Sequence, residues 1–197
     1  MGMTGYRLVL GCTLLLTAAT RLQALDLTPE TSERILEGVH IPLVLFHDSD
    51  KSFTYQPPAN WRSSGGGTSV TFYPAEPAEA SMKLRVIKHT AGAPAIANVS
   101  SEDLAKWSRS QLPANAEDLK VVSEGPNAFA IYGKSARELV FSYKVGGQRF
   151  QASVGVLDWN EREQFVAIVT AHGPDFSIVY STAIGSLGSW TKRESGS

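Results

Sequence analysis

Residues 136–158, with the sequence ARELVFSYKVGGQRFQASVGVLD, decide the fold of this chain. Two stretches in which apolar and polar side chains alternate flank the pair Gly146-Gly147. Adjacent glycines accept the positive φ angles of a two-residue turn, so the sequence predicts an antiparallel hairpin here. The turn fixes the register of the facing pairs: Val145 with Gln148, Tyr143 with Phe150, Phe141 with Ala152, and Leu139 with Val154.

The two faces of this hairpin differ in chemistry, because successive side chains of a strand point to opposite sides. One face is continuous and apolar, which predicts core: Leu139, Phe141, Tyr143, Phe150, Val154 and Val156. The other face is polar: Glu138, Ser142, Lys144, Arg149, Gln151 and Ser153. This polar face is either a solvated surface or a ligand groove beneath a helix. Under the second interpretation the candidate binding residues are Glu138, Ser142, Arg149 and Gln151.

A third strand and two helices complete the predicted architecture. The strand covers residues 164–171 and carries apolar side chains on both faces, so both faces of the sheet need a cover. Ser100 and Asp103 form a helix-start pattern before one amphipathic stretch. Asp175 is the expected cap of the last helix, whose apolar stripe is Phe176, Val179, Ala183, Leu187 and Trp190. We therefore predict the α+β class: a mainly antiparallel sheet with helices on both faces, an α/β/α sandwich.

Shorter strands are expected on the N-terminal side of the hairpin. They cover residues 41–46, 52–55, 70–73, 82–87, 119–123 and 128–132. The glycine, proline and asparagine at 125–127 predict a turn between the last two of these strands. Residues 63–67 (SSGGG) predict a flexible loop.

Glycine and proline also mark two helical features. Residues 28–30 (TPE) are typical of a helix start and Gly38 of a helix end, which together predict a helix over residues 28–37. Gly185 and Gly188 fall within the last predicted helix, where each costs about 1 kcal/mol relative to alanine. We therefore expect close packing of that helix on the sheet at these glycines.

The first 24 residues have the three parts of a secretory signal peptide. Arg7 supplies the positive charge, residues 8–19 (LVLGCTLLLTAA) are apolar, and cleavage is expected after Ala24. The apolar run is shorter than the roughly 20 residues of a spanning helix. Two alternatives stay open: an uncleaved membrane anchor, and a lipoprotein signal at Cys12. The lipoprotein signal fits less well, because most of the apolar run follows Cys12 instead of preceding it.

The composition is that of an ordinary globular domain. The 197-residue chain is 43% hydrophobic and has a net charge of −1. This balance argues against nucleic acid as the main partner, because binding to phosphates needs a basic patch. Cys12 is the only cysteine, so a chain cleaved after Ala24 has no disulfide, thiolate metal site or cysteine nucleophile. A cysteine-free exported domain is typical of a bacterial periplasm.

Several local patterns, taken in chain order, resemble the PsbP-like α/β/α superfamily. They are FTYQPPANW at 53–61, the strand at 70–73, SEDLAKW at 101–107, the central hairpin and the last helix. The superfamily includes the extrinsic photosystem II protein, DcrB-type bacterial periplasmic proteins and a Ran-binding nuclear import factor. The resemblance implies a non-catalytic accessory or binding protein. The chain then divides into a signal peptide (1–24), an N-terminal helix and strand extension (25–50), a PsbP-like domain (51–192) and a polar tail (193–197).

His47, Asp48 and Asp50 form a local cluster of possible metal ligands, and oxygen donors suit a hard cation. A polar turn, in which Asp and Ser bond their own backbone, explains the same residues. We expect no catalytic residues and no cofactor. The predicted function is a non-catalytic periplasmic or secreted bacterial protein that binds a protein partner or a small ligand in the cell envelope, with no nucleic acid and no membrane span once cleaved. The alternative is a small metal-dependent enzyme or metal-binding protein that uses these three residues.

Overall fold

The central hairpin forms at the predicted register in the computed structural model, which describes residues 25–49, 51–90 and 92–193. It consists of β8 (Lys134–Val145) and β9 (Gln148–Asn160), and all four predicted facing pairs occur. Gly146 and Gly147 have φ angles of 55° and 81°, which residues with a side chain rarely adopt. The predicted signal segment and Asp50 lie outside the described residues.

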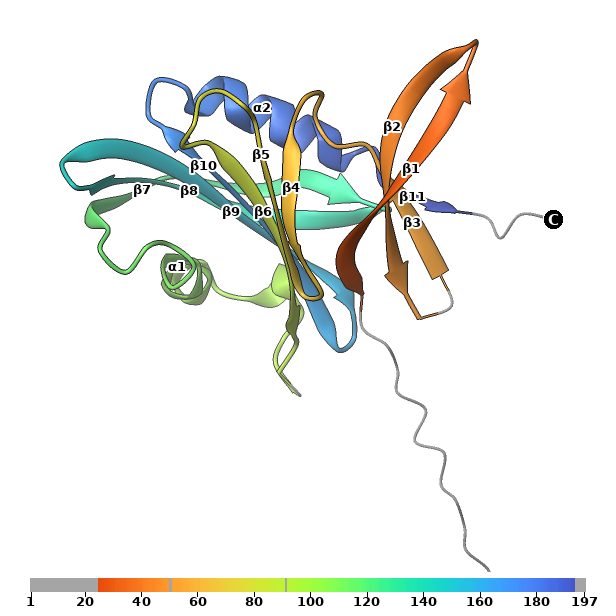
Figure 1. The fold of residues 1–197 in the computed structure, drawn as a ribbon. Helices are drawn as coiled ribbons and strands as arrows, with labels where there is room; N and C mark the ends of the chain where they lie inside the picture. Colours follow the sequence, from red (N-terminus) through yellow and green to blue (C-terminus); the bar gives the residue numbers. More distant parts are fainter. Residues whose placement is uncertain (1–24, 50, 91, 194–197) are drawn as a thin grey trace, which may run out of the picture.

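This hairpin belongs to a seven-stranded antiparallel sheet, in the order β4-β5-β6-β10-β9-β8-β7 (Figure 1). The other strands are β4 (Arg62–Gly66), β5 (Ser69–Tyr73), β6 (Ser81–Lys88), β7 (Glu117–Ile131) and β10 (Glu163–His172). β10 pairs with β6 and β9 and is apolar on both faces, as predicted. Phe165 and Ala167 enter one core cluster, whereas Val166 and Ile168 enter the other.

The two described α-helices pack in different ones of these clusters, and the short 3-10 helix η1 (Ile96–Asn98) packs in the same cluster as α1. α2 (Phe176–Leu187) buries Val179 and Ala183 in the cluster that holds Phe165. α1 (Ser101–Arg109) buries Leu104 in the cluster that holds Val166. No helix in the described part of the chain is long and apolar enough to cross a bilayer. The predicted α+β class, with a mainly antiparallel sheet, is confirmed.

A four-stranded sheet that the sequence did not predict lies beside the larger sheet (Figure 1). Its strands, in order, are β1 (Asp26–Leu36), β2 (Val39–Asp48), β3 (Lys51–Tyr55) and β11 (Thr191–Arg193). Phe46 and Phe53 of this sheet lie against Trp190, with ring centroids 5.1 and 6.3 Å apart. These rings belong to the same core cluster as α2, so this side of the large sheet is not covered by a helix alone.

The predicted helix over residues 28–37 is wrong, because this segment is strand β1. Leu27 is fully buried, and its N–H donates to the carbonyl of Gly67 at 2.6 Å, which fixes the start of the strand. Gly38 has a φ of 81° in the turn between β1 and β2, and so serves a hairpin rather than a helix end. Pairing with β2 outweighs the helix-start pattern, since local propensity is a weak prior.

Two further predictions of irregular structure are wrong. Residues 63–67 were expected to be a loop, but β4 pairs with β5 along most of this stretch. The expected turn at 125–127 lies inside β7, where the pairing with β8 shifts between Pro126 and Ala130. The chain instead turns at Tyr132 and Gly133, whose φ angles are 48° and 75°.

The last helix forms, but it ends at Leu187, before Gly188 and Trp190, which the prediction placed in it, and two further details differ. Asp175 occupies the N-cap position, yet its side chain makes no capping hydrogen bond. A Cβ atom at Gly185 would have no heavy atom within 4 Å, so this glycine does not mark close packing. The helix buries its apolar stripe through Phe176, Val179, Ala183 and Leu187.

Candidate functional site

The polar face of the β8–β9 hairpin opens into a hollow at the end of the strands that is nearest their turn. Ser142 faces Gln151 and Lys144 faces Arg149 across the two strands. Residues two apart on a strand share a face, so these four side chains project together. Asp118 and Lys120 of β7, with Gly173 and Pro174 after β10, complete the walls of a hollow of about 540 Å³. We call this space the basic hollow.

The charge of the basic hollow is positive, with three cations against one carboxylate. Lys144 Nζ lies 2.7 Å from Asp118 Oδ2, and this hydrogen bond lowers the pKa of Asp118, with the nearby charges of Lys120 and Arg149 adding to the effect. The Asp118 side chain is 63% exposed, so water screens the pair and its contribution to stability is small. The excess of positive charge suits an anionic group, because opposite charges attract at this range.

Aromatic rings pack on the face of β8 and β9 opposite the Ser142 and Lys144 side chains. Phe150 stacks on Tyr143 at a centroid distance of 5.8 Å and on His172 at 4.4 Å. Burial raises the pKa of Tyr143, partly offset by its hydrogen bond to Thr170. These contacts fix the backbone of both strands beside the cationic side chains, so the hollow is built on rigid elements.

The structure brings three of the four predicted binding residues together and separates the fourth. Ser142, Arg149 and Gln151 line the basic hollow. Glu138 is only 4% exposed and lies under α2, where it accepts hydrogen bonds from the hydroxyls of Ser153 and Tyr180. The Tyr180 bond measures 2.8 Å, and burial together with the Glu138 carboxylate raises the pKa of Tyr180. Glu138 therefore joins the helix to the sheet, and the part of the predicted groove beneath the helix is filled.

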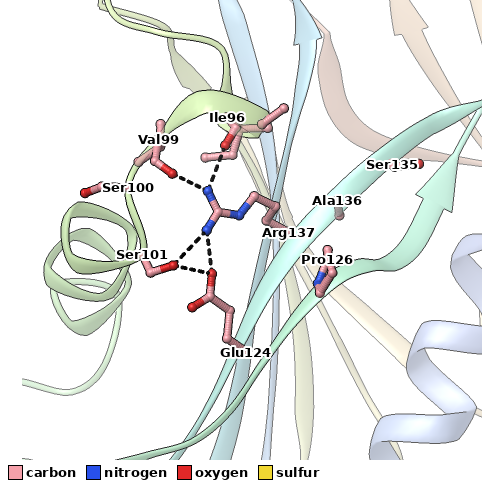
Figure 2. A pocket seen from close by; sticks show the side chains of 10 residues that line it. Ile96, Val99, Ser100, Ser101, Glu124, Pro126, Ser135, Ala136 and Arg137 are labelled. Carbon is pink, nitrogen blue, oxygen red and sulfur yellow. Dashed lines mark hydrogen bonds and ion pairs between the residues drawn. The ribbon is translucent and has the colours of Figure 1, made fainter.

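A second hollow, of about 720 Å³, lies between β8 and the chain before α1 (Figure 2). Arg137 points into it from β8 and donates to the carbonyls of Ile96, at 3.3 Å, and Val99. The same guanidinium donates to Ser101 Oγ at 3.4 Å and pairs with Glu124 (Figure 2). Sequence reasoning did not single out Arg137.

The polar groups of this second hollow satisfy one another. Glu124 also accepts a hydrogen bond from Ser101 Oγ at 3.0 Å. The hydrogen bond from Arg137 is the main cause that lowers the pKa of Glu124. A ligand would have to replace these bonds to be recognised there. We therefore regard the Arg137 cluster as a structural tie and the basic hollow as the candidate site.

A third hollow, of about 240 Å³, lies beneath α1. Its wall is mostly apolar and includes Ile87, Leu104, Trp107 and Val156. Its volume is below the roughly 300–1,000 Å³ that is usual for small-molecule sites. It is the weakest of these three candidates.

The predicted metal ligands are occupied by other partners where the structure describes them. His47 Nε2 lies 3.2 Å from Glu30 Oε2, and His47 Nδ1 lies 3.1 Å from Ser52 Oγ. Asp48 accepts a hydrogen bond from the indole of Trp159 at 2.9 Å. Within residues 25–49, 51–90 and 92–193, no three His, Cys, Asp or Glu side chains are grouped to hold a metal ion. Because Asp50 is not among these residues, the metal site stays a prediction.

No protein-family model matches this chain, and no curated protein matches it in sequence. Solved structures similar to it include the cyanobacterial PsbP (CyanoP) of Synechocystis, at 12% identity and a TM-score of 0.49 over 72% of this chain and 86% of that one. LpqN of Mycobacterium tuberculosis, described as involved in cell envelope biogenesis, is 12% identical over 85% and 92% of the two chains, with a TM-score of 0.46.

The Ran-binding protein Mog1p of Saccharomyces cerevisiae is 8% identical over 80% of this chain and 86% of its own, with a TM-score of 0.41. A PsbP protein is thus among the solved structures similar to this chain. At these identities the likeness concerns the fold alone.

Proposed function

We propose that this chain is a non-catalytic, exported binding protein of the bacterial cell envelope that holds an anionic group of its ligand in the basic hollow. The observation that carries the proposal is the convergence of Lys120, Lys144 and Arg149, with Asp118 as the one carboxylate in the wall. In architecture it is an α/β/α sandwich with the four-stranded sheet beside α2.

The side chains of the basic hollow suit recognition of an anion. Arg149 offers a planar fork of donors that matches carboxylate and phosphate oxygens, and Lys120 offers a mobile ammonium. The Ser142 hydroxyl and the Gln151 amide add neutral hydrogen-bond donors from the same face. The Lys144 ammonium pairs with Asp118 of the same wall. Such a set binds charge without supplying an activated nucleophile and a base, which supports binding over catalysis.

Export and location rest on the sequence of the first 24 residues. The charged, apolar and small-residue parts around Arg7, residues 8–19 and Ala24 favour cleavage and transfer to the periplasm or beyond. The proposed ligand carries the anionic group that the basic hollow holds, and it is either a protein partner with acidic side chains or a small organic anion.

The test is isothermal titration calorimetry with two probes, inorganic phosphate and citrate, which distinguish a phosphate from a carboxylate ligand. The double substitution Lys120→Ala and Arg149→Ala removes one lysine and one arginine from the wall. We expect it to weaken binding of the preferred probe at least tenfold, since each lost contact to a charged group is worth about 1.5–3 kcal/mol.

The matched control is Lys51→Ala with Arg62→Ala, which removes the same two residue types from exposed positions on β3 and β4. The control should bind like the wild type. If both variants lose affinity equally, the effect depends on the net charge of the protein and not on the basic hollow. If the wild type gives no saturable heat with either probe, the proposal is refuted.

A further inference from the structure

We infer that cleavage after Ala24 completes the fold, because the new α-ammonium of Leu25 forms a buried ion pair with the carboxylate of Glu163. The inference rests on the export part of the proposed function. It concerns a group that the basic hollow does not use.

Glu163 is a buried carboxylate at the start of β10, only 8% exposed. Its Oε2 atom accepts a hydrogen bond from Asn160 Nδ2 at 3.0 Å and lies 3.5 Å from the backbone nitrogen of Leu25. None of the ion pairs within residues 25–49, 51–90 and 92–193 involves Glu163. A buried carboxylate without a cation is costly, since the charged form loses its hydration.

Leu25 is held in place independently of that carboxylate. Its side chain is 1% exposed and belongs to the core cluster, as does the fully buried Leu27. Leu27 N–H donates to the Gly67 carbonyl at 2.6 Å, and Thr28 Oγ1 accepts from Gly67 N–H at 2.8 Å. The core and the β4–β5 turn therefore fix the nitrogen of Leu25 beside Glu163.

Cleavage changes the charge at this fixed position. In the uncleaved chain the nitrogen of Leu25 is a neutral amide that offers one donor. After hydrolysis of the Ala24–Leu25 bond it is an ammonium with three donors, while the carboxylate of Ala24 leaves with the leader peptide. The short gap to Glu163 then holds a charge-assisted hydrogen bond, which is shorter and stronger than a neutral one.

The experiment is a double-mutant cycle on the chain from Leu25 onward, which contains every described element. Four proteins are compared by thermal unfolding: the free α-amine and the Nα-acetylated form, each with Glu163 and with Glu163→Gln. Acetylation removes the charge and keeps an N–H donor, and glutamine keeps the bond to Asn160. We expect acetylation to lower Tm by about 3–6 °C with Glu163 and by less than about 1 °C with Glu163→Gln.

An equal change in Tm on acetylation in both backgrounds would overturn the inference. The cycle uses chains of defined start, so it does not depend on export. N-terminal sequencing of exported protein and titration of the basic hollow test the proposed function separately. Either of these two tests can give a negative result while the mutant cycle still detects the ion pair between Leu25 and Glu163.

Discussion

Arg137 and Glu138 are neighbours on β8, yet they point to opposite faces of the sheet and join it to different segments. Arg137 bonds the carbonyls of Ile96 and Val99, directly before α1. Glu138 accepts the hydroxyl of Tyr180 from α2. Alternation along one strand thus lets two consecutive polar residues tie different segments to opposite faces of the sheet.

Replacing Glu138 should destabilise the fold rather than impair binding. Glu138→Ala leaves the hydroxyls of Tyr180 and Ser153 without their acceptor beneath the helix. We expect a loss of about 2–3 kcal/mol in the free energy of unfolding, as for other buried groups that lose a charged partner. Urea melts provide the measurement. Arg149→Ala, on the exposed rim of the hairpin, should stay within about 0.5 kcal/mol of the wild type, and an equal loss there would contradict the assignment.

The pair of Glu124 and Arg137 predicts a dependence of stability on pH. Because Arg137 lowers the pKa of Glu124 below its ordinary value of 4.5, the ionised form is favoured in the folded state. The stability from the pair is present above that ordinary value and is lost as the pH falls through the lowered pKa. The difference in unfolding free energy between wild type and Glu124→Gln should therefore shrink from about pH 5 downward.

The control is the same substitution in an Arg137→Ala background, where the pH-dependent difference should largely disappear. If it persists there, another group lowers the pKa of Glu124. Sequence alone contains a signal for this tie. Arg137 has the same parity as the core-facing Leu139 and Phe141, and an arginine on an apolar face needs partners.

At the scale of elements, β7 and β9 touch across the strand that separates them. A Cβ atom at Gly155 of β9 would lie 2.8 Å from Cζ of Phe129, a β7 residue, and closer still to a second ring atom. Phe129 is 6% exposed and belongs to the core cluster of α2. The absence of a side chain at Gly155 thus leaves room for the Phe129 ring on the face of the sheet that packs in the core cluster of α2.

Gly155→Ala should cost about 1–3 kcal/mol, the usual range for overpacking. Phe129→Leu shortens the ring side chain, so the cost of the added methyl group should fall markedly in the double variant. Urea melts of the four proteins measure the coupling. Additive losses would show that Phe129 does not occupy the space over Gly155.

The elements that the sequence predicts well are those fixed by local geometry. The Gly146-Gly147 turn determines the β8–β9 register, and Ser100 begins α1 with a hydrogen bond from Asp103 N–H at 3.1 Å. The elements that it misses depend on distant contacts. β1 is a strand because it pairs with β2 and with the turn after β4, and nothing in residues 28–30 encodes those partners.

The candidate site was partly predictable for the same reason. The register places Ser142 opposite Gln151 and Lys144 opposite Arg149, so these side chains must share a face. The contributions of Asp118 and Lys120 depend on the register between β7 and β8, which is irregular between Glu117 and Lys120. No local sequence pattern predicts this shift in register. The position of α2, which covers Glu138 and leaves Ser142 open, is likewise a tertiary outcome.

At the scale of the whole molecule, the predicted cleavage site lies next to a core residue. Leu25, which directly follows the expected cleavage after Ala24, is buried in the core. N-terminal sequencing of protein exported by a bacterial host should therefore read Leu25 as the first residue. Protein that starts at Met1, or that carries lipid on Cys12, would contradict the predicted cleavage.

The central claim is that the basic hollow binds anions, and the most direct test locates the binding on the molecule. In ¹H–¹⁵N correlation spectra titrated with inorganic phosphate, we predict saturable shifts that are largest for the amides of Lys120, Ser142 and Gln151. Shifts that are largest around Ser101 and Glu124, or no saturable shift at all, would contradict it.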